Sequence, residues 1–225
     1  MMTDIKGINM KKAFTMLELV FVIVVLGILA ALAVPRLDRD LRQEAADNVL
    51  SAIRYTQHLA LVDDKQQFDK SKWQRRFWRL YFGVCDSKPF YAIGTDDNRD
   101  GSSNARVDIK ESPLDPANGK HIWAHDGTSC EGSHNLSDIS PDIFLGKKYG
   151  ITSITHSGGC STNFIGFDHL GRPYTTGFQQ SSKPDNSGYM TSECTFTFTL
   201  SDGTNFSINI EPETGHAYIV GQPNS

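Results

Sequence analysis

The feature that most constrains this chain is an apolar run near its N-terminus. Residues 14–34 contain one charged side chain, Glu18. As a helix rising about 1.5 Å per residue, this run would be roughly 30 Å long, which is the thickness of a bilayer's hydrocarbon core. Lys11 and Lys12 precede it, and positive residues favour the cytoplasmic side. We therefore expect a membrane-spanning helix, with the long C-terminal part of the chain across the membrane.

A cleavable signal peptide or a plain anchor is the alternative. A signal peptide has a shorter apolar core followed by a small-residue cleavage site. Residues 31–33, Ala-Leu-Ala, imitate such a site, but the apolar run before them is too long. A carboxylate inside a membrane helix also costs about 2.5–3.5 kcal/mol, so Glu18 calls for a partner. These observations favour a specialised anchor.

Residues 11–19, Lys-Lys-Ala-Phe-Thr-Met-Leu-Glu-Leu, resemble the class III signal of type IV prepilins and type II secretion pseudopilins. The resemblance implies that a prepilin peptidase cleaves between Ala13 and Phe14 and methylates the new amino group of Phe14. It also implies that Glu18 pairs with the Phe14 amine of a neighbouring subunit, since each charge alone is costly to bury. Ala13 stands where most members carry glycine, and it keeps the small size.

One long helix is expected from about Phe14 to about Val62. Pro35, where the family also has a proline, is expected to kink it, and membrane helices tolerate such kinks. The second half carries an apolar stripe at spacings of three and four, which indicates a face laid on a globular domain. The chain then divides into four segments: leader 1–13, transmembrane half 14–34, amphipathic half 35–66 and globular domain 67–225.

The C-terminal third predicts an antiparallel meander. Residues 195–200 and 206–211 alternate between apolar and polar side chains around a turn at Asp202-Gly203, and residues 216–220 follow a second turn. The Phe167-Asp168-x-x-Gly171-Arg172 stretch and Glu213-Thr214-Gly215 are similar to GspH/FimT-like minor pseudopilins. We therefore expect an α+β protein of type IV pilin-like fold, with the long helix packed on an antiparallel sheet. Residues 122–124 and 151–155 are further expected strands.

Four cysteines follow the apolar run, and none forms a Cys-x-x-Cys pair, so a zinc site is disfavoured. An even number in an exported domain indicates two disulfides, with three pairings open. We favour Cys85–Cys130 with Cys160–Cys194, and free buried thiols are the alternative.

Residues 69–83 interleave basic and aromatic side chains. Cations that hold phosphates beside rings that stack on bases are typical of a nucleic-acid surface. A strand with solvated arginines is the simpler interpretation, because Phe77, Arg79 and Tyr81 alternate with the residues between them. The nucleic-acid surface and the strand are compatible if Arg75, Arg76 and Arg79 point outward. The candidate DNA contacts are Lys72, Arg75, Arg76 and Arg79.

Asp96, Asn98 and Asp100, followed by Gly101, match the first half of a calcium loop. The acid expected at the twelfth position is absent, since that residue is Val107. Runs of Asp, Asn and Gly are also ordinary turn chemistry. Calcium is therefore the one cofactor that the sequence suggests, with a plain turn as the alternative.

No catalytic motif is present in the sequence, so we do not expect an enzyme. The net charge of −4 argues against a broadly basic surface. We expect a bacterial inner-membrane subunit with a periplasmic domain, assembling with other pilins or pseudopilins through a prepilin peptidase and an assembly platform. Type II secretion, type IV pili and DNA uptake are all open as its machine. The alternatives are a DNA-binding minor pilin for transformation and an anchored periplasmic enzyme.

Overall fold

A computed structural model describes residues 16–67, 72–97, 107–178 and 186–222, with the backbone alone for residues 30–40. The chain divides into two compact units, residues 1–40 and residues 41–225. Helix α1 (Met16–Val62) contributes to both units. Its end at Val62 is where the sequence predicts it, shortly before the polar residues 63–65.

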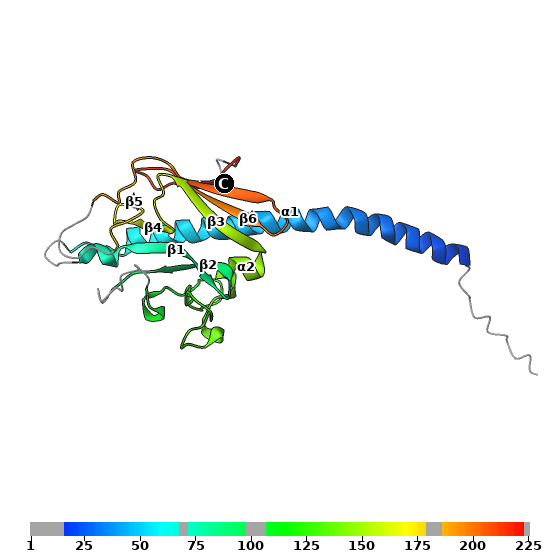
Figure 1. Ribbon diagram of the computed structural model, residues 1–225, viewed down its shortest axis with the longest axis horizontal. Coiled ribbons are helices and arrows are strands. Elements are labelled where there is room, and N and C mark those ends of the chain that lie inside the picture. The colour runs from blue at the N-terminus through cyan, green and yellow to red at the C-terminus, as the bar shows by residue number, and fades with distance from the viewer. Residues whose placement is uncertain (1–15, 68–71, 98–106, 179–185, 223–225) are drawn as a thin grey trace, which may run out of the picture. The chain divides into compact units, whose positions relative to one another are not determined.

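The unit of residues 41–225 contains two four-stranded antiparallel sheets (Figure 1). The first has the order β2-β1-β4-β5 and the second the order β3-β6-β7-β8. The first sheet is formed by β1 (Trp78–Cys85), β2 (Lys88–Gly94), β4 (Phe164–Phe167) and β5 (Pro173–Tyr174). The second is formed by β3 (Ile151–Gly158), β6 (Cys194–Leu200), β7 (Asn205–Ile210) and β8 (Ala217–Ile219).

The predicted meander is confirmed in the second sheet. Strand β6 alternates buried and half-buried residues along its whole length, so its phenylalanines face the core and its threonines face outward. Gly203, with φ +83°, allows the turn into β7. In the first sheet Asp86 and Ser87 both have positive φ, which is the two-residue hairpin geometry that suits the twist of β1 and β2.

The core lies between α1 and the two sheets. Ala45, Val49 and Ile53 are fully buried on α1, one turn apart, as the apolar stripe predicts. Phe82 of β1 packs edge-on against Phe196 and Phe198 of β6, at ring centroid distances of 5.1 and 5.3 Å. The α+β arrangement of a long helix on antiparallel sheets is therefore confirmed.

One predicted strand is wrong. Residues 122–124 form no strand; they lie alongside β2, where Ile93 N donates to Ile122 O at 3.0 Å. The Trp123 indole donates to Val107 O at 2.8 Å, so the apolar residues here fill the core from a loop. The described part of this long connection also contains four short helices: η2 (Ile109–Glu111), η3 (Leu136–Asp138), η4 (Pro141–Ile143) and α2 (Leu145–Lys148). A further short helix, η1 (Trp73–Arg76), precedes β1.

Candidate assembly site

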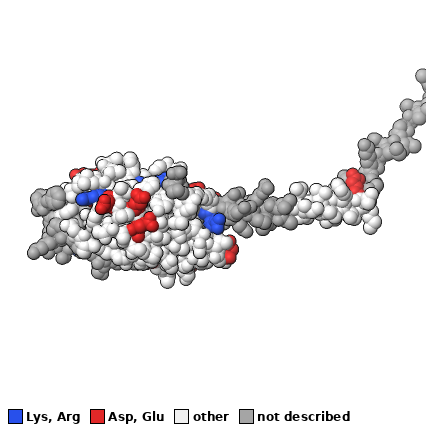
Figure 2. All heavy atoms as spheres, turned by 90° about the horizontal axis from the view of Figure 1, so that it is seen from above, with Lys and Arg blue, Asp and Glu red and all other residues white. Residues whose placement is uncertain are grey.

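The N-terminal part of α1 exposes apolar side chains on all sides. Every large apolar residue from Met16 to Leu29 is exposed, by 38–87% of its surface. Glu18 is the one charged residue of this stretch, which is otherwise uncharged in Figure 2. An apolar surface of this extent marks a site of association with another apolar phase or partner. Ala13 and Phe14, the predicted processing residues, lie outside the described residues, and so does the side chain of Pro35.

Among the residues that the structure describes, no helical stretch is both long and apolar enough to cross a membrane.

Gln57, in the C-terminal part of α1, joins the helix to both sheets. Its side-chain amide donates to Gly171 O at 2.9 Å and to Thr214 O at 2.8 Å. Gly171 lies in the turn between β4 and β5, and Thr214 lies in the turn between β7 and β8. Arg54, one turn earlier, donates to Ala217 O at 2.9 Å. One glutamine therefore ties α1 to a turn of each sheet.

Both turns belong to the sequence motifs noted above. The buried Asp168 carboxylate accepts from Leu170 N, from Arg172 N and from the Arg172 guanidinium at 2.7–3.0 Å, which holds the first turn closed. The hydrogen bond that the Arg172 guanidinium donates to Asp168 raises the pKa of Arg172. In the second turn, a Cβ on Gly215 would lie 2.6 Å from Gly171 O. The two motifs therefore serve to dock α1 on the sheets. The sequence alone did not reveal this role, because it depends on the contact of Gln57 with both turns.

Residues 72–83, the described part of the basic-aromatic stretch, do not form the outward-facing surface that DNA binding requires. Arg79 is fully buried, so the prediction that it points outward is wrong. Its guanidinium donates to Arg75 O at 2.6 Å and lies over the Phe178 ring at 5.5 Å. Burial lowers the pKa of Arg79 to about 10, and the charges of Asp96 and Glu111 oppose that effect. Trp73 and Phe77 are also buried and offer no ring for stacking on a base.

The other candidate DNA contacts, Lys72, Arg75 and Arg76, are half-buried. Arg76 pairs with Asp97 at 2.6 Å, and this hydrogen bond lowers the pKa of Asp97. Lys72 adopts a left-handed conformation before η1, and Arg75 lies within that short helix. Figure 2 shows acidic and basic side chains interspersed over the visible face of the 41–225 unit. The arrangement gives the arginines a structural role.

The candidate calcium loop is described only at its first residue. Asp96 is buried, and it contributes to the electrostatic environment of the equally buried Arg79. Asn98 and Asp100 lie outside the described residues. Within the described ranges, no three His, Cys, Asp or Glu side chains come together in a way that could hold a metal ion.

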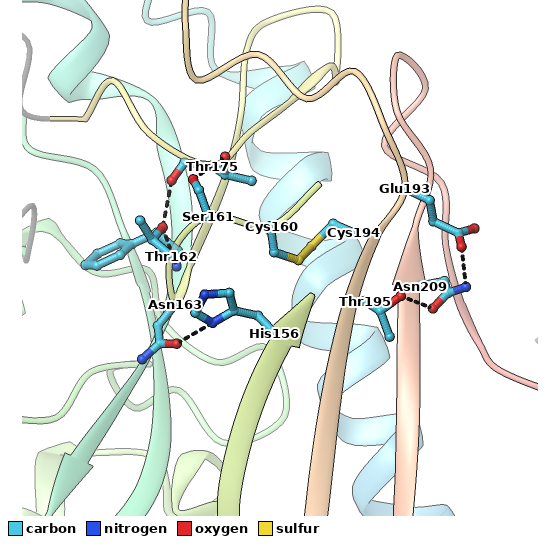
Figure 3. Close-up of a disulfide and its surroundings, with 11 residues drawn as sticks. His156, Cys160, Ser161, Thr162, Asn163, Thr175, Glu193, Cys194, Thr195 and Asn209 are labelled. Carbon is cyan, nitrogen blue, oxygen red and sulfur yellow. Dashed lines mark hydrogen bonds between the residues drawn. A yellow bond between two sulfur atoms is a disulfide. The ribbon is translucent and has the colours of Figure 1, made fainter. Parts of the chain in front are cut away.

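Both favoured disulfides are present. Cys85–Cys130 ties the end of β1 to the long connection, and Cys160–Cys194 ties the loop after β3 to the start of β6. Figure 3 shows the second disulfide with its polar surroundings. There His156 contacts Asn163 at 3.1 Å, and Thr162 donates to Thr175 O at 2.7 Å. The free-thiol alternative is wrong, because each cysteine lies within reach of one partner.

Comparison with known proteins supports the N-terminal assignment. The family model of the prokaryotic N-terminal methylation motif matches residues 8–34. This match contains both predicted processing residues and Glu18, and it indicates a type IV pilin-like protein. No curated protein and no solved structure matches this chain.

Proposed function

We propose that this protein is a minor pilin or pseudopilin subunit of the GspH/FimT-like kind, built into a periplasmic filament of a secretion, pilus or DNA-uptake machine. A prepilin peptidase removes residues 1–13 and methylates Phe14, and the anchor holds the subunit in the inner membrane before assembly. The observation that carries this proposal is the methylation motif at residues 8–34, within which every large apolar side chain of α1 from Met16 to Leu29 is exposed.

The physical reason is the cost of leaving that surface in water. Apolar area removed from water contributes about 25 cal/mol per Å², so a helix exposed on every side gains most from a membrane or from neighbouring helices. A carboxylate at Glu18 becomes favourable in such surroundings only with a positive partner. The new Phe14 amine of an adjacent subunit supplies that charge and sets the axial register between subunits.

The alternative of a DNA-binding subunit receives no support from the described part of the domain. Arg79 is buried, Arg76 is paired with Asp97, and the rings beside them are in the core. Phosphate binding needs several cations free to displace counterions. We therefore assign the 41–225 unit a role in contacts with proteins.

The test is incorporation of a Glu18→Ala variant into filaments in the source bacterium. We expect a folded and processed subunit that is absent from sheared filament fractions, because the Phe14 amine loses its partner. Mass spectrometry of the membrane-bound pool should show N-methylated Phe14 at the N-terminus in variant and parent alike.

Glu44→Ala is the matched control, because it removes an exposed acid from the same helix within the 41–225 unit. It should assemble as the parent does. Normal incorporation of Glu18→Ala, or a mature N-terminus that retains residues 1–13, would contradict the proposal.

A further inference from the structure

A cavity of about 260 Å³ is lined by α1, by β2 and by the long connection between β2 and β3, which is drawn in green in Figure 1. Helix α1 contributes Asn48, Ala52 and Tyr55, which share one face of the helix because they are spaced by four and three residues. Tyr91 contributes from β2 and Asp115 from the connection. The whole cavity lies within the 41–225 unit, so it is separate from the exposed apolar part of α1.

The side chain of Asn48 supplies the first observation that points to a ligand. It hydrogen-bonds to Tyr91, which is buried. The Oδ1 atom of Asn48 is shielded from solvent, and none of the described groups donates a hydrogen bond to it. A buried acceptor without a donor is costly, so the cavity favours an occupant that brings an N–H or O–H group.

The carboxylate of Asp115 is held in a fixed position at the same cavity. Its Oδ1 accepts from Ala117 N at 2.9 Å. Its Oδ2 accepts from Ser140 Oγ at 2.6 Å and from Asn118 Nδ2 at 3.0 Å. A carboxylate oxygen has two acceptor sites, so Oδ1 has one left for a further donor. No lysine or arginine of the described ranges forms an ion pair with Asp115.

A second carboxylate, Asp142 of η4, also lines the cavity. Lys148 pairs with Asp142 at 2.6 Å and lies 3.4 Å from Glu44, so this lysine is shared between two acids. The charge of Asp115 comes in addition to those two acids. The lining is therefore negative overall, and a complementary occupant carries positive charge.

Two tyrosines and several apolar side chains form the rest of the lining. Burial raises the pKa of Tyr55 and the pKa of Tyr91, and the charge of Asp115 raises both further, which places this carboxylate near both hydroxyls. Aromatic rings attract cations, and Ala52 and Ile122 offer contacts for an aliphatic chain. A bare metal ion fits less well, because no three His, Cys, Asp or Glu side chains of the described residues come together.

We propose that this cavity binds an alkylammonium group, which comes either from a free amine or from a lysine side chain of a partner protein. The ammonium donates to Asn48 Oδ1 and to the Asp115 carboxylate, and the aliphatic chain contacts Ala52 and Ile122. An ammonium brings three donors to acceptors that lie in different directions. A guanidinium fits less well, because its planar fork needs two free oxygens of one carboxylate and Oδ2 of Asp115 already has two donors. This site goes beyond the proposed function and does not depend on assembly through the N-terminal helix.

The test is an NMR titration of the purified, isotope-labelled full chain in a non-ionic detergent. The probe is n-butylammonium, and it is compared with n-butanol, which lacks the charge, and with tetramethylammonium, which lacks N–H donors. The side-chain amide signals of Asn48 and the backbone amide of Asp115 report binding. We expect n-butylammonium to bind at least about tenfold more tightly than either comparison compound, because only it supplies both charge and donors.

Two variants test the assigned contacts. Asp115→Asn should weaken n-butylammonium by about tenfold, because a hydrogen bond to a charged acceptor is replaced by one to a neutral acceptor. Asn48→Ala should weaken it as well, and it leaves the hydrogen bonds of Asp115 within the connection intact. Asp138→Asn is the matched control, since Asp138 is an exposed acid of the same connection that does not line the cavity. Melting temperatures show whether each variant is folded.

A blocked lysine, N-acetyl-lysine N-methylamide, distinguishes the two sources. Tighter binding than n-butylammonium supports a lysine of a partner protein, whereas weaker binding supports a free amine. Equal affinity for n-butylammonium and n-butanol, or unchanged affinity in both cavity variants, would overturn the proposal. Calcium that shifts the same signals at lower concentration than n-butylammonium would overturn it in favour of a metal site.

Discussion

Arg79 shows how the surroundings of one residue decide its role. Its neighbours in sequence alternate as in a half-exposed strand, yet every residue from Trp78 to Phe82 is buried. Arg79 enters the core because Phe178 and the carbonyls of Arg75 and Phe77 receive its guanidinium. The charges of Asp96 and Glu111 favour the charged guanidinium, and they offset part of the cost of burying it.

We expect Arg79→Leu to lower the free energy of unfolding by about 3–5 kcal/mol, since it leaves buried acidic charge with less compensation. Adding Asp96→Asn in the same chain should recover part of that loss, because both members of the electrostatic pair are then neutral. Urea denaturation followed by tryptophan fluorescence measures both values. Equal stability of Arg79→Leu and the parent would show that the guanidinium contributes nothing to folding.

We expect the stability of the fold to depend on pH through Asp97. The hydrogen bond from Arg76 holds the pKa of Asp97 below its ordinary value of 3.8. Its contribution to stability is therefore fully present above that value and is lost as the pH falls through the folded-state pKa. The Asp97 side chain is 53% exposed, so the effect should stay under about 1 kcal/mol.

Carboxyl titration by NMR of parent and Arg76→Gln would measure this directly. The Asp97 pKa should rise in Arg76→Gln, while the pKa of the distant Asp202 should not change. An Asp97 pKa that is the same in both proteins would contradict the assigned pair.

At the level of the elements, the contact between α1 and the two turns is the one that tolerates the least change in side-chain size. Gly171 and Gly215 both have positive φ and both lie against Gln57. A side chain on either glycine would enter the space of the glutamine amide or of the opposite backbone. The helix, the β4–β5 turn and the β7–β8 turn therefore act as one unit.

We expect Gly215→Ala to be clearly more destabilising than Gly203→Ala. Both alanines would adopt positive φ, at roughly 1–2 kcal/mol, but a Cβ at residue 203 meets no atom within 4 Å. At Gly215 the Cβ would lie 2.7 Å from the Gln57 amide, so the two hydrogen bonds of Gln57 are lost as well. Thermal melts of the two variants compare them, and equal melting temperatures would remove Gln57 from its assigned role.

In the unit of residues 41–225, the two disulfides differ in how deeply their cysteines are buried. Cys160 and Cys194 are buried beside β3 and β6. Cys85 and Cys130 instead line a pocket of about 370 Å³ together with Leu136, and Cys130 is only half-buried. Both sulfurs of the first pair therefore lie in the core, whereas the second pair joins the buried Cys85 to the half-buried Cys130.

Graded reduction should open Cys85–Cys130 before Cys160–Cys194, because the half-buried Cys130 is easier for a reductant to reach than either residue of the other pair. Differential alkylation with mass spectrometry measures the order. Replacing Cys160 and Cys194 by serine should cost roughly 2–4 kcal/mol, as expected for a loop of this length. Simultaneous reduction of both pairs would show that the domain opens as a whole before either bond is accessible.

The sequence predicted those parts of the fold that depend on local pattern. The helix end near Val62, the alternation of β6 and β7 and the turn at Asp202-Gly203 were all readable because each depends on residues a few positions apart. The strand expected at residues 122–124 failed because its apolar residues fill the core from a loop. Local alternation does not distinguish the two.

The sequence by itself determined the methylation motif, the apolar segment after it and the helix-and-meander plan, since each is a property of neighbouring residues. Only the tertiary structure decided that Arg79 is buried and that Gln57 joins two distant turns. These outcomes depend on which segments meet across more than a hundred residues, as Gln57 and Gly171 do. Burial and hydrogen-bond partners are set by such long-range packing.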